Sequence, residues 1–160
     1  MTLNPILAFS AALLAIVLAI AAPVMRRQSL ASWLFLAGMI VLAVDSVLGG
    51  ISLMVSWPED SKVWVLRSFI VKSLIPCIWL AFSLVYSRGN FREFLLRWRL
   101  VLALALVLPV GLAIGFHSQL ILDTPPATSG RETWMSLGSP ARVLNVMLLI
   151  CNITILMNFE

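Results

Sequence analysis

Five apolar runs, each about as long as a lipid bilayer is thick, leave the chain few possible folds. A transmembrane helix needs about 20 mostly apolar residues, because the hydrocarbon core is about 30 Å thick. Within that core a helix satisfies its backbone polar groups by itself. The sequence therefore predicts an all-α polytopic bundle of five transmembrane helices, a single transmembrane domain over residues 1–160. The runs are residues 3–25, 30–55, 63–86, 100–116 and 141–157.

Composition excludes a soluble domain of this length. Hydrophobic residues make up 61% of the chain, charged residues only 11%, and the mean hydropathy is +1.04. A soluble domain carries about twice that share of charge. The first run does not read as a cleaved signal peptide, because Arg26 and Arg27 follow it, whereas a signal peptide has its positive charge in front. We interpret this run as an anchored helix.

The net charge is +4, but most of the basic residues cluster in two short connections between apolar runs. This is the pattern of loops in a membrane protein, and it argues against nucleic-acid binding. Two alternate connections hold six arginines and one glutamate, whereas the other side holds three basic and four acidic residues. Because basic loops stay in the cytoplasm, this predicts an N-terminus outside and a C-terminus inside. Five of the six tryptophans lie at or near run ends, as expected at a membrane interface. The six arginines are Arg26, Arg27, Arg88, Arg92, Arg97 and Arg99.

The inner connection between the third and fourth runs has an amphipathic pattern of its own. Asn90 followed by Glu93 resembles a capping box, which begins a helix. Aromatic and leucine side chains then gather on one face and charged ones on the other. We predict a short interfacial helix whose arginines face anionic lipid of the inner leaflet; a plain basic loop is the alternative. The basic residues of this loop are Arg88, Arg92, Arg97 and Arg99.

Three ionisable residues lie where the membrane should resist them most. Asp45, Arg67 and Lys72 fall inside the second and third runs, and each costs roughly 2.5–3.5 kcal/mol at a helix centre unless paired or hydrated. Counted from the turn at residues 56–62, Asp45 and Lys72 both lie about 15–16 Å deep at 1.5 Å per residue. We therefore expect Asp45 within ion-pair reach of Lys72 or Arg67. Arg67, about 7–8 Å deep, either completes this cluster or extends outward to the interface. The functional interpretation is an intramembrane polar site; the alternative is a structural pair that fixes helix register.

No constellation for catalysis, metal binding or a cofactor is visible in the sequence. Cys77 and Cys151 lie inside apolar runs without metal-ligand spacing, and His117 has no neighbouring ligand residues. We therefore expect no catalytic residue, no metal and no cofactor in these 160 residues.

Two weaker patterns concern helix packing. Asn145 and Asn152 are seven residues apart and share a helix face, which predicts hydrogen bonds across helices. Gly111 and Gly115 form a GxxxG pattern, which marks a packing face or a dimer face.

The stretch RSFIVKSLIPCIWLAFSLVYSRGNFREFLLRWR, residues 67–99, resembles a known family, as does VLNVMLLICNITILMNFE near the end. Both are similar to the N-terminal membrane region of bacterial sensor histidine kinases associated with PEP-CTERM/exosortase systems, the PrsK group. The resemblance implies a multi-pass protein of the bacterial inner membrane. It further implies a longer parent chain with more spans, which dimerises through its kinase portion. The present residues would then sense or anchor without catalysing.

A second class of function stays open: a stand-alone small membrane protein, either a transporter-like unit or a structural partner. Only three residues follow the last run, which favours a longer parent. Transporters often contain internal repeats, and none is convincing here. The segment between the fourth and fifth runs, residues 117–140, is long for a mere connection and is a candidate sensing surface.

Overall fold

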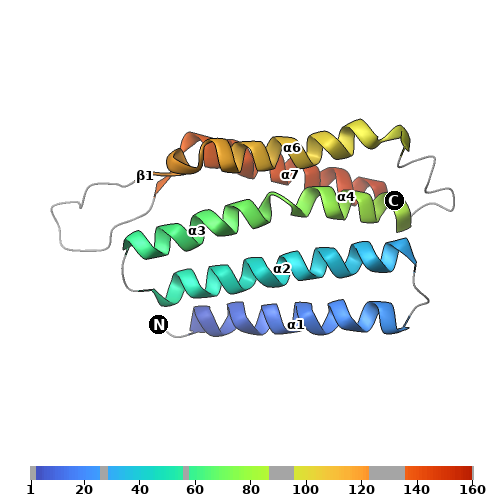
Figure 1. Cartoon of the computed structure of the whole chain (residues 1–160), viewed down its shortest axis with the longest axis horizontal. Coiled ribbons are helices and arrows are strands. Elements are labelled where there is room, and N and C mark those ends of the chain that lie inside the picture. Colours follow the sequence, from blue (N-terminus) through green and yellow to red (C-terminus); the bar gives the residue numbers. More distant parts are fainter. Residues whose placement is uncertain (1–2, 26–28, 56–57, 87–95, 123–135, 160) are drawn as a thin grey trace.

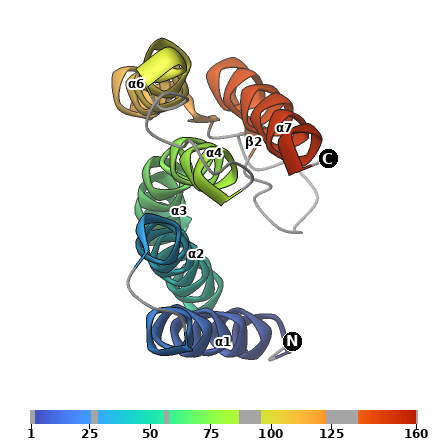
Figure 2. The same ribbon diagram turned by 90° about the vertical axis from the view of Figure 1, so that its right-hand side faces the viewer.

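The computed structural model describes residues 3–25, 29–55, 58–86, 96–122 and 136–159. The first three spans follow one another side by side, and the last two both pack beyond the third (Figures 1 and 2). Successive spans run in opposite directions, so their ends lie alternately at the two ends of the bundle, as a polytopic protein requires (Figure 1). The N-terminus, the junction between the second and third spans and a small β-hairpin lie at one end, and the C-terminus lies at the other (Figure 1).

Helices α1 (Leu3–Met25) and α2 (Leu30–Met54) pack through small residues. Small side chains matter here because lipid offers no hydrophobic drive to association, so close van der Waals contact must supply it. A Cβ added to Gly50 would lie 3.1 Å from the Phe9 ring, so glycine permits this approach. Further along the interface, buried alanines of α1 meet α2 at a shared cluster. That cluster contains Ala15, Ala19, Met39 and Ala43.

The third predicted span is present, and it is built from two helical segments. It consists of α3 (Pro58–Lys72) and α4 (Ile75–Tyr86). Pro76 has no N–H to donate to the carbonyl of Lys72, and its ring crowds the preceding turn. The helix also begins at Pro58, inside the predicted turn, because proline is well suited to a first helical position.

Trp79, the tryptophan placed within a span, docks α4 against α2. Its ring centroid lies 5.9 Å from that of Phe35 and 5.5 Å from that of Phe82, both edge to face. Gly38 leaves room for it, since an added Cβ would lie 3.2 Å from the indole. The Trp79 indole therefore packs in the core of the bundle and does not act as an interfacial anchor.

The last two spans are α6 (Arg99–Gly115) and α7 (Ser139–Phe159). Between them lie the 3-10 helix η1 (His117–Gln119) and the strands β1 (Ile121–Leu122) and β2 (Ser136–Leu137), which pair antiparallel. The predicted connection at residues 117–140 thus has secondary structure at both ends, and residues 123–135 lie outside the described part. The hairpin contributes to a core cluster of Phe69, Ala113, Leu120, Ile121, Ala141 and Leu144.

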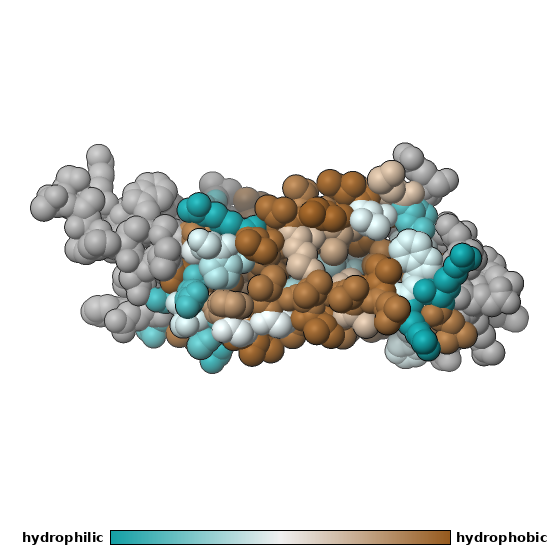
Figure 3. Space-filling view, turned by 90° about the horizontal axis from the view of Figure 1, so that it is seen from above, coloured by the Kyte–Doolittle hydropathy of each residue, from teal (hydrophilic) through white to brown (hydrophobic). Residues whose placement is uncertain are grey.

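The predicted five-span bundle is confirmed. Four spans are long and apolar enough to cross a bilayer, among them the composite Asp60–Tyr86, and α6 with 17 residues is at the lower limit. A broad apolar band separates two polar ends (Figure 3). Most of the predicted interfacial helix lies outside the described residues, including Arg88 and Arg92. Of its basic residues, Arg97 and Arg99 are described and exposed.

Candidate functional site

Asp45 and Lys72, predicted from depth alone to be neighbours, lie close together. Asp45 is on α2 and Lys72 is the last residue of α3, and the Lys72 Nζ is 3.8 Å from the Asp45 Oδ1. The aspartate side chain is 17% exposed and the lysine side chain 42% exposed. The carboxylate is therefore mostly enclosed by protein, while the ammonium stays partly open.

A serine that the sequence analysis missed completes this cluster. The Ser68 hydroxyl donates a hydrogen bond of 2.5 Å to the same Asp45 Oδ1, and Ser68 is only 5% exposed. Ser68 and Lys72 are four residues apart, so both project from the same face of α3 toward α2. That spacing is the sequence signal that identifies Ser68 as a partner.

Arg67, the third residue of the predicted polar site, lies elsewhere. It is exposed, and its guanidinium carbon is 4.9 Å from the centroid of the Trp64 ring. Such a cation–π contact contributes about 0.5–1 kcal/mol at exposed positions. One residue along a helix is a rotation of 100°, so Arg67 and Ser68 occupy different faces of α3. The structure therefore brings together Asp45, Ser68 and Lys72.

The helix break begins directly after Lys72. Ser73 is fully buried and its hydroxyl donates to the Ile70 carbonyl at 2.5 Å. The Leu74 N–H donates to the Val71 carbonyl at 3.1 Å, a tighter turn than an α-helix makes. The ion pair thus sits at the point where the third span changes from α3 to α4.

Beyond the break, α4 is tied to α7 by one side-chain hydrogen bond. The Asn158 Nδ2 donates to the Ser83 Oγ at 3.0 Å, and the Ser83 hydroxyl donates to the Leu80 carbonyl at 2.9 Å. The cross-helix role predicted for Asn145 and Asn152 is wrong for the bundle, because both lie exposed on its outside. Asn158 makes that kind of contact instead.

The predicted GxxxG packing face is also absent from the described bundle. Gly111 and Gly115 are exposed, and a Cβ added to either would meet no atom within 4 Å. Helix α6 packs instead through Ala105, Pro109 and Ala113, its buried residues.

The cluster combines an ion pair with a hydrogen bond. Such an arrangement is suited to binding a ligand or to switching between two conformations. Across the described ranges, no three His, Cys, Asp or Glu side chains come together in a way that would hold a metal ion. His117 lies exposed in η1, at the hairpin end of α6.

The fold and this cluster define a polytopic helical membrane domain with a polar pair inside it. Residues 7–156 match the family model described as the N-terminal 7TM region of histidine kinase. Because the match covers nearly the whole chain, the chain belongs to this family. No curated protein and no solved structure matches it.

Proposed function

We propose that this chain is the sensory and anchoring membrane region of a two-component histidine kinase in PEP-CTERM/exosortase-linked signalling. Family membership supports the histidine kinase, and the resemblance of residues 67–99 supports the PEP-CTERM link. In this proposal the residues are the N-terminal part of a longer chain, lie in the bacterial inner membrane and do not catalyse. The parent chain dimerises through its kinase portion.

The single observation that carries a sensory role is the position of the polar cluster at the helix break. An intramembrane ion pair is costly and is a functional hypothesis by default. Here Asp45 holds the end of α3 through Ser68 and Lys72, and the next residues interrupt the helix. A ligand or proton that changed this pair would bias how α3 and α4 meet.

The path from the cluster to the far membrane face runs along α4. Near that face α4 is tied to α7 through Ser83 and Asn158, and the charge pattern predicts that this face is the cytoplasmic one. A change in how α3 and α4 meet would therefore be transmitted to α7, the helix that leads toward the proposed kinase module. A ligand can shift such an equilibrium only by its differential affinity for the two states.

A structural role is the second candidate, and one observation favours it. Among the described residues, no buried side-chain nitrogen or oxygen lacks a hydrogen-bond partner. A fully satisfied cluster is what a register-fixing pair between α2 and α3 needs. In that case the chain would only anchor its parent, or would be a stand-alone membrane protein.

Kinase assays on the parent chain separate these candidates. We expect Asp45→Asn to change how autophosphorylation responds to growth conditions, because it removes the charge and keeps an acceptor for Ser68. Deletion of residues 124–130 tests the outer segment in the same assay. Ser10→Ala, exposed on α1 and bonded only within its own helix, is the control. Unchanged responses would reduce the region to an anchor, and ATP turnover by the isolated chain would contradict the whole proposal.

The proposed orientation has its own measurement. With the N-terminus outside, alkaline phosphatase fused after residue 60 or residue 130 should be active, because the enzyme folds only outside the cytoplasm. Fusions after residue 27 or residue 92 should be inactive, and fluorescent-protein fusions should show the reverse. Activity at residue 92 would invert the topology and would move the basic loop away from the inner-leaflet lipid that it is proposed to contact.

A further inference from the structure

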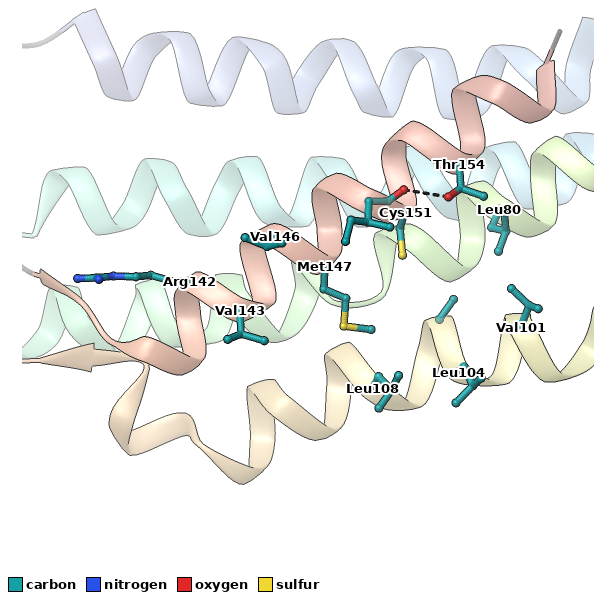
Figure 4. A pocket seen from close by; sticks show the side chains of 12 residues that line it. Leu80, Val101, Leu104, Leu108, Arg142, Val143, Val146, Met147, Cys151 and Thr154 are labelled. Carbon is teal, nitrogen blue, oxygen red and sulfur yellow. Dashed lines mark hydrogen bonds between the residues drawn. The ribbon is translucent and has the colours of Figure 1, made fainter.

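An open groove runs between α6 and α7, away from the polar cluster. The two helices diverge on either side of α4 (Figure 2), and Leu80 of α4 lies at the base of the space between them (Figure 4). The volume is about 670 Å³, which is within the range of about 300–1,000 Å³ typical of small-molecule sites. Its walls are aliphatic, with Val101, Leu104 and Leu108 on α6 and Val143, Val146 and Ile150 on α7.

The groove has one charged end. Arg142 lines it at the hairpin end of α7, and its side chain extends away from the aliphatic stretch (Figure 4). Arg142 is exposed, and within the described ranges no carboxylate pairs with it. At the other end, the Thr154 hydroxyl already donates to the Ile150 carbonyl at 2.9 Å. The groove therefore suits a molecule with a long apolar body and an anionic head.

The single charged end and the length of the groove favour one acyl chain as the occupant. The lining on α7 extends from Arg142 to Thr154, or about 18 Å at 1.5 Å per residue. That is close to the reach of one acyl chain, about half of a core about 30 Å thick. On α6 the lining runs from Val101 to Leu108, in the half of that helix away from the hairpin, so the end of the chain would lie past the middle of the bundle. We propose that the groove binds one acyl chain of an anionic phospholipid from the leaflet at the hairpin end, with Arg142 binding its phosphate.

The two exposed glycines of α6 fit this assignment. At 100° per residue, Leu104, Leu108, Gly111 and Gly115 fall within an arc of about 60°, so the glycines continue the groove-facing stripe toward the hairpin end. A Cβ at either glycine would meet no atom within 4 Å. The stripe thus has no side chains at the end where the broader glycerol and phosphate would lie.

Lipid retention tests the proposal. The protein is reconstituted in nanodiscs of dioleoyl phosphatidylglycerol or dioleoyl phosphatidylcholine, extracted mildly, and its retained lipid is counted by native mass spectrometry. We expect one retained phosphatidylglycerol, preferred about tenfold because charge-assisted hydrogen bonds are the stronger kind. Arg142→Gln should reduce the preference to within about twofold. Leu108→Trp should abolish retention of both lipids by filling the groove.

The matched control is Leu106→Trp, an exposed leucine on the same helix that does not line the groove. It should retain lipid as the unsubstituted protein does. Equal retention of both lipids, or equal effects of the two tryptophans, would mean non-specific annular lipid only and would overturn the proposal. A photo-crosslinking residue at position 108 supplies a second measurement in cell membranes. A phospholipid adduct exceeding that at position 106 supports the site, whereas a crosslink to another transmembrane segment overturns it.

Discussion

Asp45→Ala is expected to destabilise the bundle by about 3–5 kcal/mol, more than the loss of both ion-pair partners together. The single change leaves the Lys72 ammonium in a low-dielectric environment without its carboxylate, and breaking such a pair by removing one partner is strongly destabilising. It also removes the acceptor of the Ser68 hydroxyl, which is buried. In the double variant Asp45→Ala with Lys72→Ala, the stranded charge is gone, so the cost should be smaller. Unfolding by titration with sodium dodecyl sulfate in mixed micelles measures each value.

Two further variants sharpen this cycle. Asp45→Asn keeps an acceptor for Ser68 and removes only the charge, so its cost should fall below that of Asp45→Ala. Asn152→Ala removes a polar side chain that is exposed on α7 and should change stability by no more than about 0.5 kcal/mol. Costs that simply add in the double variant would show that Asp45 and Lys72 are not coupled.

Gly138→Ala is expected to disrupt the hairpin end of the bundle and to cost about 3 kcal/mol, the upper end of the usual range for overpacking. A Cβ at this position would lie 1.9 Å from the backbone oxygen of Gln119, so backbone must move to admit it. Gly138 also forms backbone hydrogen bonds through both its N–H and its carbonyl. Its N–H donates to the Leu120 carbonyl at 2.9 Å, and its own carbonyl accepts from the Arg142 N–H at 3.2 Å. The hairpin and the first turn of α7 should therefore loosen together.

The control for this change is Gly49→Ala. Gly49 lies inside α2, and a Cβ there would meet no atom within 4 Å. Alanine is a better helix former than glycine by about 0.5–1 kcal/mol, so stability should stay level or rise. Thermal unfolding in one detergent, followed by circular dichroism, compares the two variants. A Gly138→Ala protein that melts at the unsubstituted midpoint would contradict this placement of the chain around Gln119.

The spans and the Asp45–Lys72 contact were predictable from sequence because they depend on counting. Apolar length sets where a helix crosses, and equal depth on two helices joined by a short turn places two residues side by side. The position of each residue around the helix axis was a second source of information, which the depth estimate did not use. It puts Ser68 on the face of Lys72 and turns Arg67 away, so the composition of the cluster was readable at four-residue spacing.

Other features depend on packing that a single sequence does not display. The pairing of Asn158 with Ser83 requires knowing that α7 crosses α4 at that level, and neither residue differs in type from others that stay exposed. The GxxxG pattern does not mark a packing face within the bundle, for a related reason; its other reading, a dimer face, stays a prediction. Close packing needs small residues on both helices at the crossing point, and here α6 crosses its neighbours at Ala105 and Ala113. The sequence shows the proline that interrupts the third span, Pro76. Only the structure shows that the interruption lies next to Lys72 and its ion pair.

Unequal span lengths affect the lipid around this protein. Helix α2 has 25 residues and the composite third span 27, whereas α6 has 17, or about 38, 41 and 26 Å at 1.5 Å per residue. A single hydrocarbon thickness of about 30 Å cannot match all three upright, so the long spans must tilt or kink, while beside the short one the bilayer thins or flanking side chains extend to the interface. The surrounding membrane therefore meets a hydrophobic belt of uneven height, tall along α2 and low along α6.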